Sequence, residues 1–248
     1  MKTVIGTKAE LCEKIAAEFA SAVEKRPEAA FGFTAVDVPP EALEAIAGCG
    51  ADFSRAAAFN ACEYLGAPDA LTQAADLRAH LYDKTAFAAV HVPAEGEDYD
   101  AAIRAAGGLE LVLLGVGERG HVAFCEPGAD FGSGTYIAKL ADVTRKQASE
   151  RFGSLDDTPT HGVTMGIATL LGAKRILLVA CGEDKANAAQ KTIGGRPESF
   201  IPASFLQLHS DVTVFLDEAA ASKLYSLPIC FRGAAPPGAA PRIFSQKG

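Results

Sequence analysis

Short apolar runs alternate with amphipathic segments along most of this chain. Thr7 with Glu10 three residues later forms a capping-box pattern, and apolar residues then recur at helical spacing through residues 10–26. We therefore predict a first helix that ends at about Arg26.

The same alternation continues beyond this helix. Apolar runs predict strands at residues 29–36, 55–64, 87–92, 109–117 and 174–182, and periodic segments predict helices at 39–48, 68–84, 98–108 and 184–194. Nearly continuous apolar strands between helices indicate a parallel sheet that is covered on both faces. The predicted fold class is α/β, a three-layer α/β/α, Rossmann-like arrangement with a mostly parallel, doubly wound sheet.

We predict one such domain over residues 1–231. The segment 232–248, RGAAPPGAAPRIFSQKG, is rich in proline, glycine and alanine and cannot hold a regular helix or strand for long. We expect it to be a loosely packed or disordered tail.

Ligands of open parallel sheets bind beyond the carboxyl ends of the strands. Three predicted strand ends carry polar residues: FNACEY at 59–64, GVGERGH at 115–121 and CGEDK at 181–185. Gly117 and Gly120 are predicted substrate-binding positions, because glycine lets the backbone and His121 approach a ligand closely.

Composition narrows the function further. The formal net charge of −8 gives no basic field for nucleic acid, and no stretch approaches the roughly 20 apolar residues of a membrane span. We expect a cytoplasmic protein that binds neither nucleic acid nor membrane. The six cysteines are scattered without a C-x-x-C pair, which predicts reduced thiols.

A longer string around the second strand end is more specific. Residues 115–135, GVGERGHVAFCEPGADFGSGT, resemble the motif G-x-G-x-D-G-H-x-A-F-N-E-P-x-x-x-x-x-S-x-T of the glucosamine-6-phosphate deaminase family. Segments FNACEYLG at 59–66, THGVTMGIATLLGAKRILLVACGEDKANA at 160–188 and IPASFLQLHSDVTVFLDEAAASKL at 201–224 also resemble that family, in the same order. The related phosphogluconolactonases share the fold but usually have T-A-S-L-F-P in place of VAFCEPG, so the deaminase side is favoured.

The resemblance implies roles for four matching residues. His121 corresponds to the ring-opening acid/base and Glu126 to the carboxylate that orients it, a pairing suited to proton transfer near neutral pH. Lys185 and Arg151 correspond to cations that bind the sugar phosphate.

Two departures affect the implied chemistry. The family's proton-abstracting aspartate falls on Cys62, and a thiol with an ordinary pKa of about 8.5 is mostly protonated at pH 7. Its neighbour Glu63 serves as the base only if the strand end has already turned, because successive strand residues point to opposite faces. The aspartate of the family's D-G-H is replaced by Arg119 in this chain. This cation either lowers the pKa of His121 by repulsion or pairs with Glu118, Glu126 or an anionic ligand.

A third departure lies after the first predicted strand. The family's phosphate loop, a Thr/Ser-Gly-Gly-Thr/Ser run, should fall in FGFTAVDVPPEAL, where Ala35, Val36, Asp37 and Val38 stand instead. A carboxylate then lies where phosphate oxygens would sit. Asp37 has a second interpretation, as an acidic residue near the start of the next helix.

Three hypotheses remain for the thiols. Cys62 and Cys125 are small neutral fillers of a pocket that no longer carries catalysis, or they join His121 in a zinc site, or one is a nucleophile activated by Arg119. The first interpretation requires no metal, and we predict none and no cofactor.

Two functions follow. The first is a ketol isomerase/deaminase of amino-sugar phosphate metabolism, acting on a hexosamine 6-phosphate, with Cys62 or Glu63 as the base; its deaminase activity is predicted to be weak or absent because the base and phosphate loop are replaced. The second is a non-catalytic member that binds a small molecule or a partner. A hypothesis between these two is an enzyme whose substrate carries its anionic group elsewhere than at a 6-phosphate, where Arg119 recognises it. The expected partner is a small sugar phosphate or other anionic metabolite, and assembly into a homo-oligomer is left open.

Overall fold

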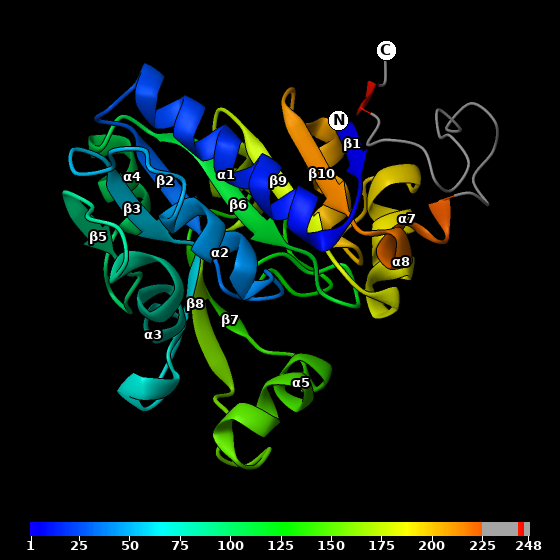
Figure 1. Ribbon diagram of the computed structural model, residues 1–248. Coiled ribbons are helices and arrows are strands. Elements are labelled where there is room, and N and C mark those ends of the chain that lie inside the picture. The colour runs from blue at the N-terminus through cyan, green and yellow to red at the C-terminus, as the bar shows by residue number, and fades with distance from the viewer. Residues whose placement is uncertain (225–242, 246–248) are drawn as a thin grey trace.

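A computed structural model describes residues 1–224 and 243–245, and Figure 1 gives the arrangement of its elements. The main sheet has the order β11-β1-β10-β9-β6-β2-β3-β5, and a smaller sheet has the order β4-β8-β7. In the main sheet, the strands from β1 to β5 in this spatial order run parallel to one another, and only β11 is antiparallel, pairing with β1. The predicted three-layer α/β/α fold with a mostly parallel sheet is confirmed.

The bounds of the elements follow the predicted alternation. The strands of the main sheet are β1 Lys2–Ile5, β2 Ala30–Phe33, β3 Ala57–Asn60, β5 Ala89–His91, β6 Leu109–Gly115, β9 Ile176–Ala180, β10 Val212–Leu216 and β11 Ile243–Ser245. The helices are α1 Lys8–Lys25, α2 Pro40–Ala47, α3 Gln73–Leu77, α4 Tyr99–Ala105, α5 Asp142–Phe152, α6 Ile167–Leu171, α7 Ala186–Gly194 and α8 Glu218–Ala221, with 3₁₀ turns at Asp69–Leu71, Glu183–Lys185 and Pro202–Leu208.

The first helix forms as its sequence predicts. The Thr7 side chain accepts a hydrogen bond from the Glu10 backbone, and the Glu10 side chain accepts one from the Thr7 backbone, which completes the capping box. The α1 side chains Leu11, Ile15 and Phe19 are fully buried against the sheet. Helix α1 therefore anchors one of the two outer layers.

Alternate residues of the strands pack into two separate hydrophobic cores, one on each face of the main sheet. Leu111 and Leu113 of β6 pack with α1 and α2 on one face, whereas Val112 and Leu114 pack with α4, α6 and α7 on the other. Burial on both faces explains why β6 reads as a continuous apolar run. Among the described residues, no helix is long and apolar enough to cross a membrane.

Two predicted elements are divided in the structure. Residues 55–64 form β3 and then β4 (Cys62–Tyr64), which pairs antiparallel with β8 (His161–Thr164) in the smaller sheet. The chain changes sheets at Ala61, whose amide still bonds Phe33 while its carbonyl accepts from Met165. One strand therefore becomes two that face different partners.

The predicted helix 68–84 is also divided. Thr72 is extended (φ −75°, ψ 160°) and its side chain caps α3, so the preceding 3₁₀ turn cannot continue into the helix. A wider π-type turn, Arg78–Tyr82, follows α3. No prediction from the sequence covers β1, β10, α6 or α8. None covers β7 (Tyr136–Lys139), β8 and α5 either, which project away from the main sheet in Figure 1.

The predicted tail, 232–248, lies largely outside the described residues, as does the domain boundary at 231. Within it only β11 is described, a three-residue strand on the edge of the main sheet.

Candidate functional site

Three neighbouring strands bring three loops together. The sheet order places β9, β6 and β2 side by side and parallel, so the loops after them meet at one edge. These loops carry Lys185, His121 and Asp37. Two of the three were expected at a site from their strand-end positions, and Asp37 joins them because β2 lies next to β6.

Asp37 links the other two residues. Its Oδ2 lies 2.9 Å from His121 Nε2, and its Oδ1 accepts a hydrogen bond from Lys185 Nζ. The three side chains are 15%, 4% and 11% exposed for Asp37, His121 and Lys185. Lys185 Nζ also lies 3.5 Å from Asp184 Oδ2 at the surface of the cluster. The result is a half-buried carboxylate with one donor on each oxygen.

The backbone allows this approach at two glycines. A Cβ atom on Gly115 would overlap the backbone of Val36 and Asp37, and one on Gly117 would overlap the ring of His121. Asp37 itself has φ 56°, in the left-handed region that aspartate tolerates better than most residues other than glycine. The loops are therefore shaped to place the Asp37 carboxylate against His121.

The charges stabilise the ionised carboxylate. Burial opposes ionisation of Asp37, but the hydrogen bond and charge of His121, with those of Lys185, outweigh it and lower the pKa of Asp37 to about 2. Asp37 is thus an anion at neutral pH. Asp37 lies just before α2, which begins at Pro40 without a side-chain cap, and its carboxylate bonds His121 and Lys185.

Cys62 lies beside this cluster as a buried thiol. Thr34 Oγ1 is 3.6 Å from Cys62 Sγ, within hydrogen-bonding distance for sulfur. Burial raises the pKa of Cys62 well above its usual range, against the lowering effect of the Thr34 bond, and the charges of Glu63 and, less strongly, Asp37 raise it further. Cys62 is therefore a neutral thiol at pH 7.

Cys125 is equally buried. Its Sγ donates to the Met165 carbonyl at 3.2 Å, and burial raises its pKa to about 12. The described part of the chain contains no group of three or more His, Cys, Asp or Glu side chains placed to hold a metal ion, so the zinc hypothesis for Cys62, Cys125 and His121 gains no support.

Glu63 points away from the cluster. Its carboxylate accepts hydrogen bonds from the backbone amides of Tyr64, Gln73 and Ala74, at 2.7 to 2.8 Å, and so caps the start of α3. Burial raises the pKa of Glu63, and these three bonds act in the opposite direction. The geometry gives Glu63 a structural task at α3, with its oxygens already engaged.

Glu126 and Arg119 do not join His121 by any bond within residues 1–224. Glu126 Oε1 accepts from the Ala141 amide at 3.1 Å, and the acceptor at His121 Nε2 is Asp37 instead. Arg119 is exposed. The expected pairing of Arg119 with Glu118 or Glu126 is absent from this described part, where Glu118 binds Gln147.

Arg151 and Gly120 serve other contacts. Arg151 forms an ion pair with Asp76 and donates to the Thr72 carbonyl at 2.9 Å, which ties α5 to the α3 segment. Gly120 has φ 80° and its backbone packs against Ile201. Of the two cations expected to bind phosphate, the structure brings only Lys185 to His121.

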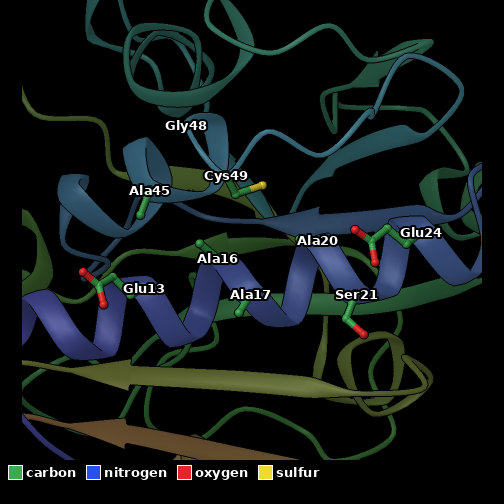
Figure 2. A pocket seen from close by; sticks show the side chains of 9 residues that line it. All are labelled: Glu13, Ala16, Ala17, Ala20, Ser21, Glu24, Ala45, Gly48 and Cys49. Atoms are coloured by element: carbon green, nitrogen blue, oxygen red, sulfur yellow. The ribbon is translucent and has the colours of Figure 1, made fainter.

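Hollows elsewhere on the surface involve other residues. Figure 2 shows one of about 620 Å³ between α1 and α2, and a second of about 340 Å³ lies by α4 and α6. The first is lined by Glu13, Ala16, Ala17, Ala20, Ser21, Glu24, Ala45, Gly48 and Cys49. Neither hollow includes a residue of the His121 cluster, and small side chains with two carboxylates give the first no directed chemistry.

Comparison with known proteins identifies relatives over most of the chain. Residues 6–215 match the family model described as glucosamine-6-phosphate isomerases/6-phosphogluconolactonase. A glucosamine-6-phosphate deaminase of Pseudarthrobacter chlorophenolicus is 38% identical over 217 residues, 82% of this chain and 84% of the relative. One of Rhodopirellula baltica is 43% identical over 184 residues, 69% of this chain and 73% of the relative.

Solved structures agree with these sequence matches. A monomeric glucosamine-6-phosphate deaminase superimposes with a TM-score of 0.84 at 31% identity, covering 90% of this chain and 99% of that one. A 6-phosphogluconolactonase of Thermotoga maritima gives 0.67 at 18% identity, over 87% and 99% of the two chains, which shows a shared fold.

Proposed function

Because the chain belongs to the glucosamine-6-phosphate isomerase/6-phosphogluconolactonase family, we propose that it is a divergent member in carbohydrate metabolism whose deaminase activity is weak or absent. The observation that carries this proposal is Cys62. It is 1% exposed, and its pKa is raised well above the usual range by burial. The position that the family resemblance assigns to the base therefore holds a proton that it does not release near pH 7.

The isomerisation step explains why this position decides the activity. Conversion of an aldose to a ketose requires a base that takes the C2 proton and returns it at C1. Loss of a general base slows such a transfer by roughly 10² to 10⁴-fold. Glu63, the neighbouring carboxylate, is held by three backbone amides at α3 and is not directed to Cys62.

His121 keeps a partner suited to proton transfer. We assign it the ring-opening acid/base role, with Asp37 in place of Glu126 as the carboxylate that orients its Nε2. Ring opening and closing would then remain available even where deamination is lost. Lys185, on the second oxygen of Asp37, fixes the carboxylate and completes the proposed site.

A non-catalytic, ligand-binding member is the second candidate. It is favoured by the combination of a buried, fully paired polar cluster with a neutral thiol, because such a cluster holds its shape without supplying a base. Under this proposal the site binds a sugar without converting it.

One assay separates the two candidates. Ammonium release and fructose 6-phosphate formation are measured with glucosamine 6-phosphate, while calorimetry follows binding of the same compound, fructose 6-phosphate and 6-phosphogluconate. The Pseudarthrobacter relative serves as the positive control. We expect turnover at least a hundredfold below this control. Binding without turnover supports the non-catalytic candidate, and turnover at the control's rate overturns the main proposal.

A further inference from the structure

We propose that Asp37 is a specificity-determining residue: its carboxylate takes the anionic position between His121 and Lys185, so the site accepts a sugar or amino sugar without a phosphate there. The inference deepens the proposed function and rests on this site being the sugar site. It adds a substrate class, an unphosphorylated polyhydroxylated ligand, to a family that is named for phosphorylated ones.

Asp37 occupies the two N–H donors that converge at this site. The imidazole Nε2 of His121 and the ammonium of Lys185 each bind a different oxygen of Asp37. A phosphate group is bound by N–H donors of the same kind, which approach its oxygens from different sides. Both donors are already occupied by an anion that belongs to the chain.

The charge of Asp37 also opposes a phosphate at this site. Asp37 is ionised at neutral pH and is largely shielded from water. A phosphate that approached Lys185 would meet this negative charge in a poorly solvated place, where repulsion is screened less than at the surface. A neutral hydroxyl group meets no such repulsion and can donate to the carboxylate.

The packing of its backbone fixes the Asp37 carboxylate in place. The backbone of Val36 and Asp37 passes so close to Gly115 that a Cβ atom there would overlap it. The Val36 amide also donates to Thr34 Oγ1 at 3.0 Å, and Asp37 is held at φ 56°. A ligand phosphate would have to displace a side chain whose own backbone is packed in position.

The φ angle of Asp37 allows a substitution that removes the anion without straining the loop. Glycine adopts a φ of 56° without strain, so Asp37→Gly keeps the loop conformation while it removes the anion. Asp37→Asn keeps the shape of the side chain and removes only its charge. Asp83→Asn, at an exposed residue, makes the same charge change away from the cluster and is the matched control.

The experiment is a calorimetric titration of the wild type and these variants with inorganic phosphate, glucosamine and glucosamine 6-phosphate. We expect the wild type to bind the last two within threefold of each other and to show no measurable phosphate binding. Asp37→Gly should show measurable phosphate binding and should prefer glucosamine 6-phosphate to glucosamine at least tenfold. Asp37→Asn should lie between, and Asp83→Asn should match the wild type.

Further readouts keep the outcomes separate. Lys185→Met in the Asp37→Gly background should abolish the gained phosphate affinity, which ties the gain to this site. Circular dichroism checks that each variant is folded, and the wild-type comparison of the two sugars needs no variant. The inference is overturned if the wild type prefers glucosamine 6-phosphate tenfold, or if folded Asp37 variants gain no phosphate affinity. Inorganic phosphate cannot be deaminated, so its titration decides the role of Asp37 whatever the turnover assay shows about the proposed function.

Discussion

Gly117 lies directly beneath His121, so that a Cβ atom at position 117 would overlap Cε1, Nε2 and Nδ1 of the imidazole. The ring can move away only by leaving Asp37, its partner at 2.9 Å. We therefore expect Gly117→Ala to lower the free energy of unfolding by about 1–3 kcal/mol, the usual effect of overpacking, and to abolish sugar binding. Urea unfolding and calorimetric titration measure the two effects.

Gly132→Ala is the control for this change. The nearest atom to a Cβ there is 3.8 Å away, an ordinary contact. We expect a change in stability within about 0.5 kcal/mol and unchanged binding. Equal effects of the two substitutions would show that the Gly117 contact does not position His121.

Acid should destabilise the protein through Asp37. Its pKa is lowered from 3.8 to about 2 in the folded state, so the contribution to stability is complete above about pH 4 and is lost as the pH falls through 2. A shift of this size corresponds to about 2 kcal/mol. Urea unfolding between pH 2 and pH 6 should show this loss in the wild type and not in Asp37→Asn. Parallel pH profiles of the two proteins would contradict the assignment.

Glu63 provides a test of structural against catalytic roles. Glutamine at this position keeps one acceptor oxygen but cannot accept from all three amides of Tyr64, Gln73 and Ala74. We expect Glu63→Gln to cost about 1–2 kcal/mol of unfolding free energy, with sugar affinity unchanged. Glu95→Gln, at an exposed residue, is the control for the charge change. Unchanged stability with lost turnover would instead restore Glu63 as a base.

The fold could be predicted from the sequence because its signals are local. The Thr7 capping box, the doubly apolar strand β6 and the alternation of periods each depend on residues close in the chain. The sheet change at Ala61 depends instead on β8, a strand that pairs from a hundred residues away, and local periodicity carries no information about it.

The site could be predicted in part for the same reason. His121 and Lys185 lie just after strand ends, within sequence segments that resemble the family. The task of Asp37 depends on β2 lying beside β6, which no local pattern specifies. The available signal was an aspartate where the family resemblance calls for glycine, since both residues tolerate the left-handed backbone that Asp37 adopts. Roles for Glu126 and Arg151 stay predictions, and their bonds in the structure go to Ala141, Asp76 and Thr72.

Thiol labelling should distinguish Cys62 from Cys49. Cys62 is 1% exposed with a raised pKa, whereas Cys49 is partly exposed. The thiolate is the reactive form, so we expect iodoacetamide at pH 7.5 to modify Cys49 in the native protein and Cys62 only after unfolding. Peptide mass mapping reads each site separately. Labelling of Cys62 at the rate of Cys49 would show an accessible thiolate and would revive the nucleophile hypothesis.

Restoring the family's two aspartates should not by itself restore deamination. In the Cys62→Asp, Arg119→Asp double variant, the new carboxylate at 62 is fully buried, where burial and the charges of Glu63 and, to a smaller extent, Asp37 already raise the pKa of the Cys62 thiol. Burial and neighbouring carboxylates favour the protonated form, so the new base would be neutral. Addition of Asp37→Gly removes one of these anions and vacates Lys185 for a phosphate.

We therefore expect the double variant to remain at background ammonium release and the triple variant to exceed it at least tenfold, with the Rhodopirellula relative as the positive control. A triple variant with Asp83→Asn in place of Asp37→Gly should stay at background, because it relieves charge at an exposed residue only. Turnover by the double variant at the relative's rate would show that Asp37 obstructs neither the base nor the phosphate. Activity that appears only when Asp37→Gly is added would instead mean that the Asp37 carboxylate, placed by a loop packed on Gly115, is a third difference, beside Cys62 and Arg119, that separates this chain from its deaminase relatives.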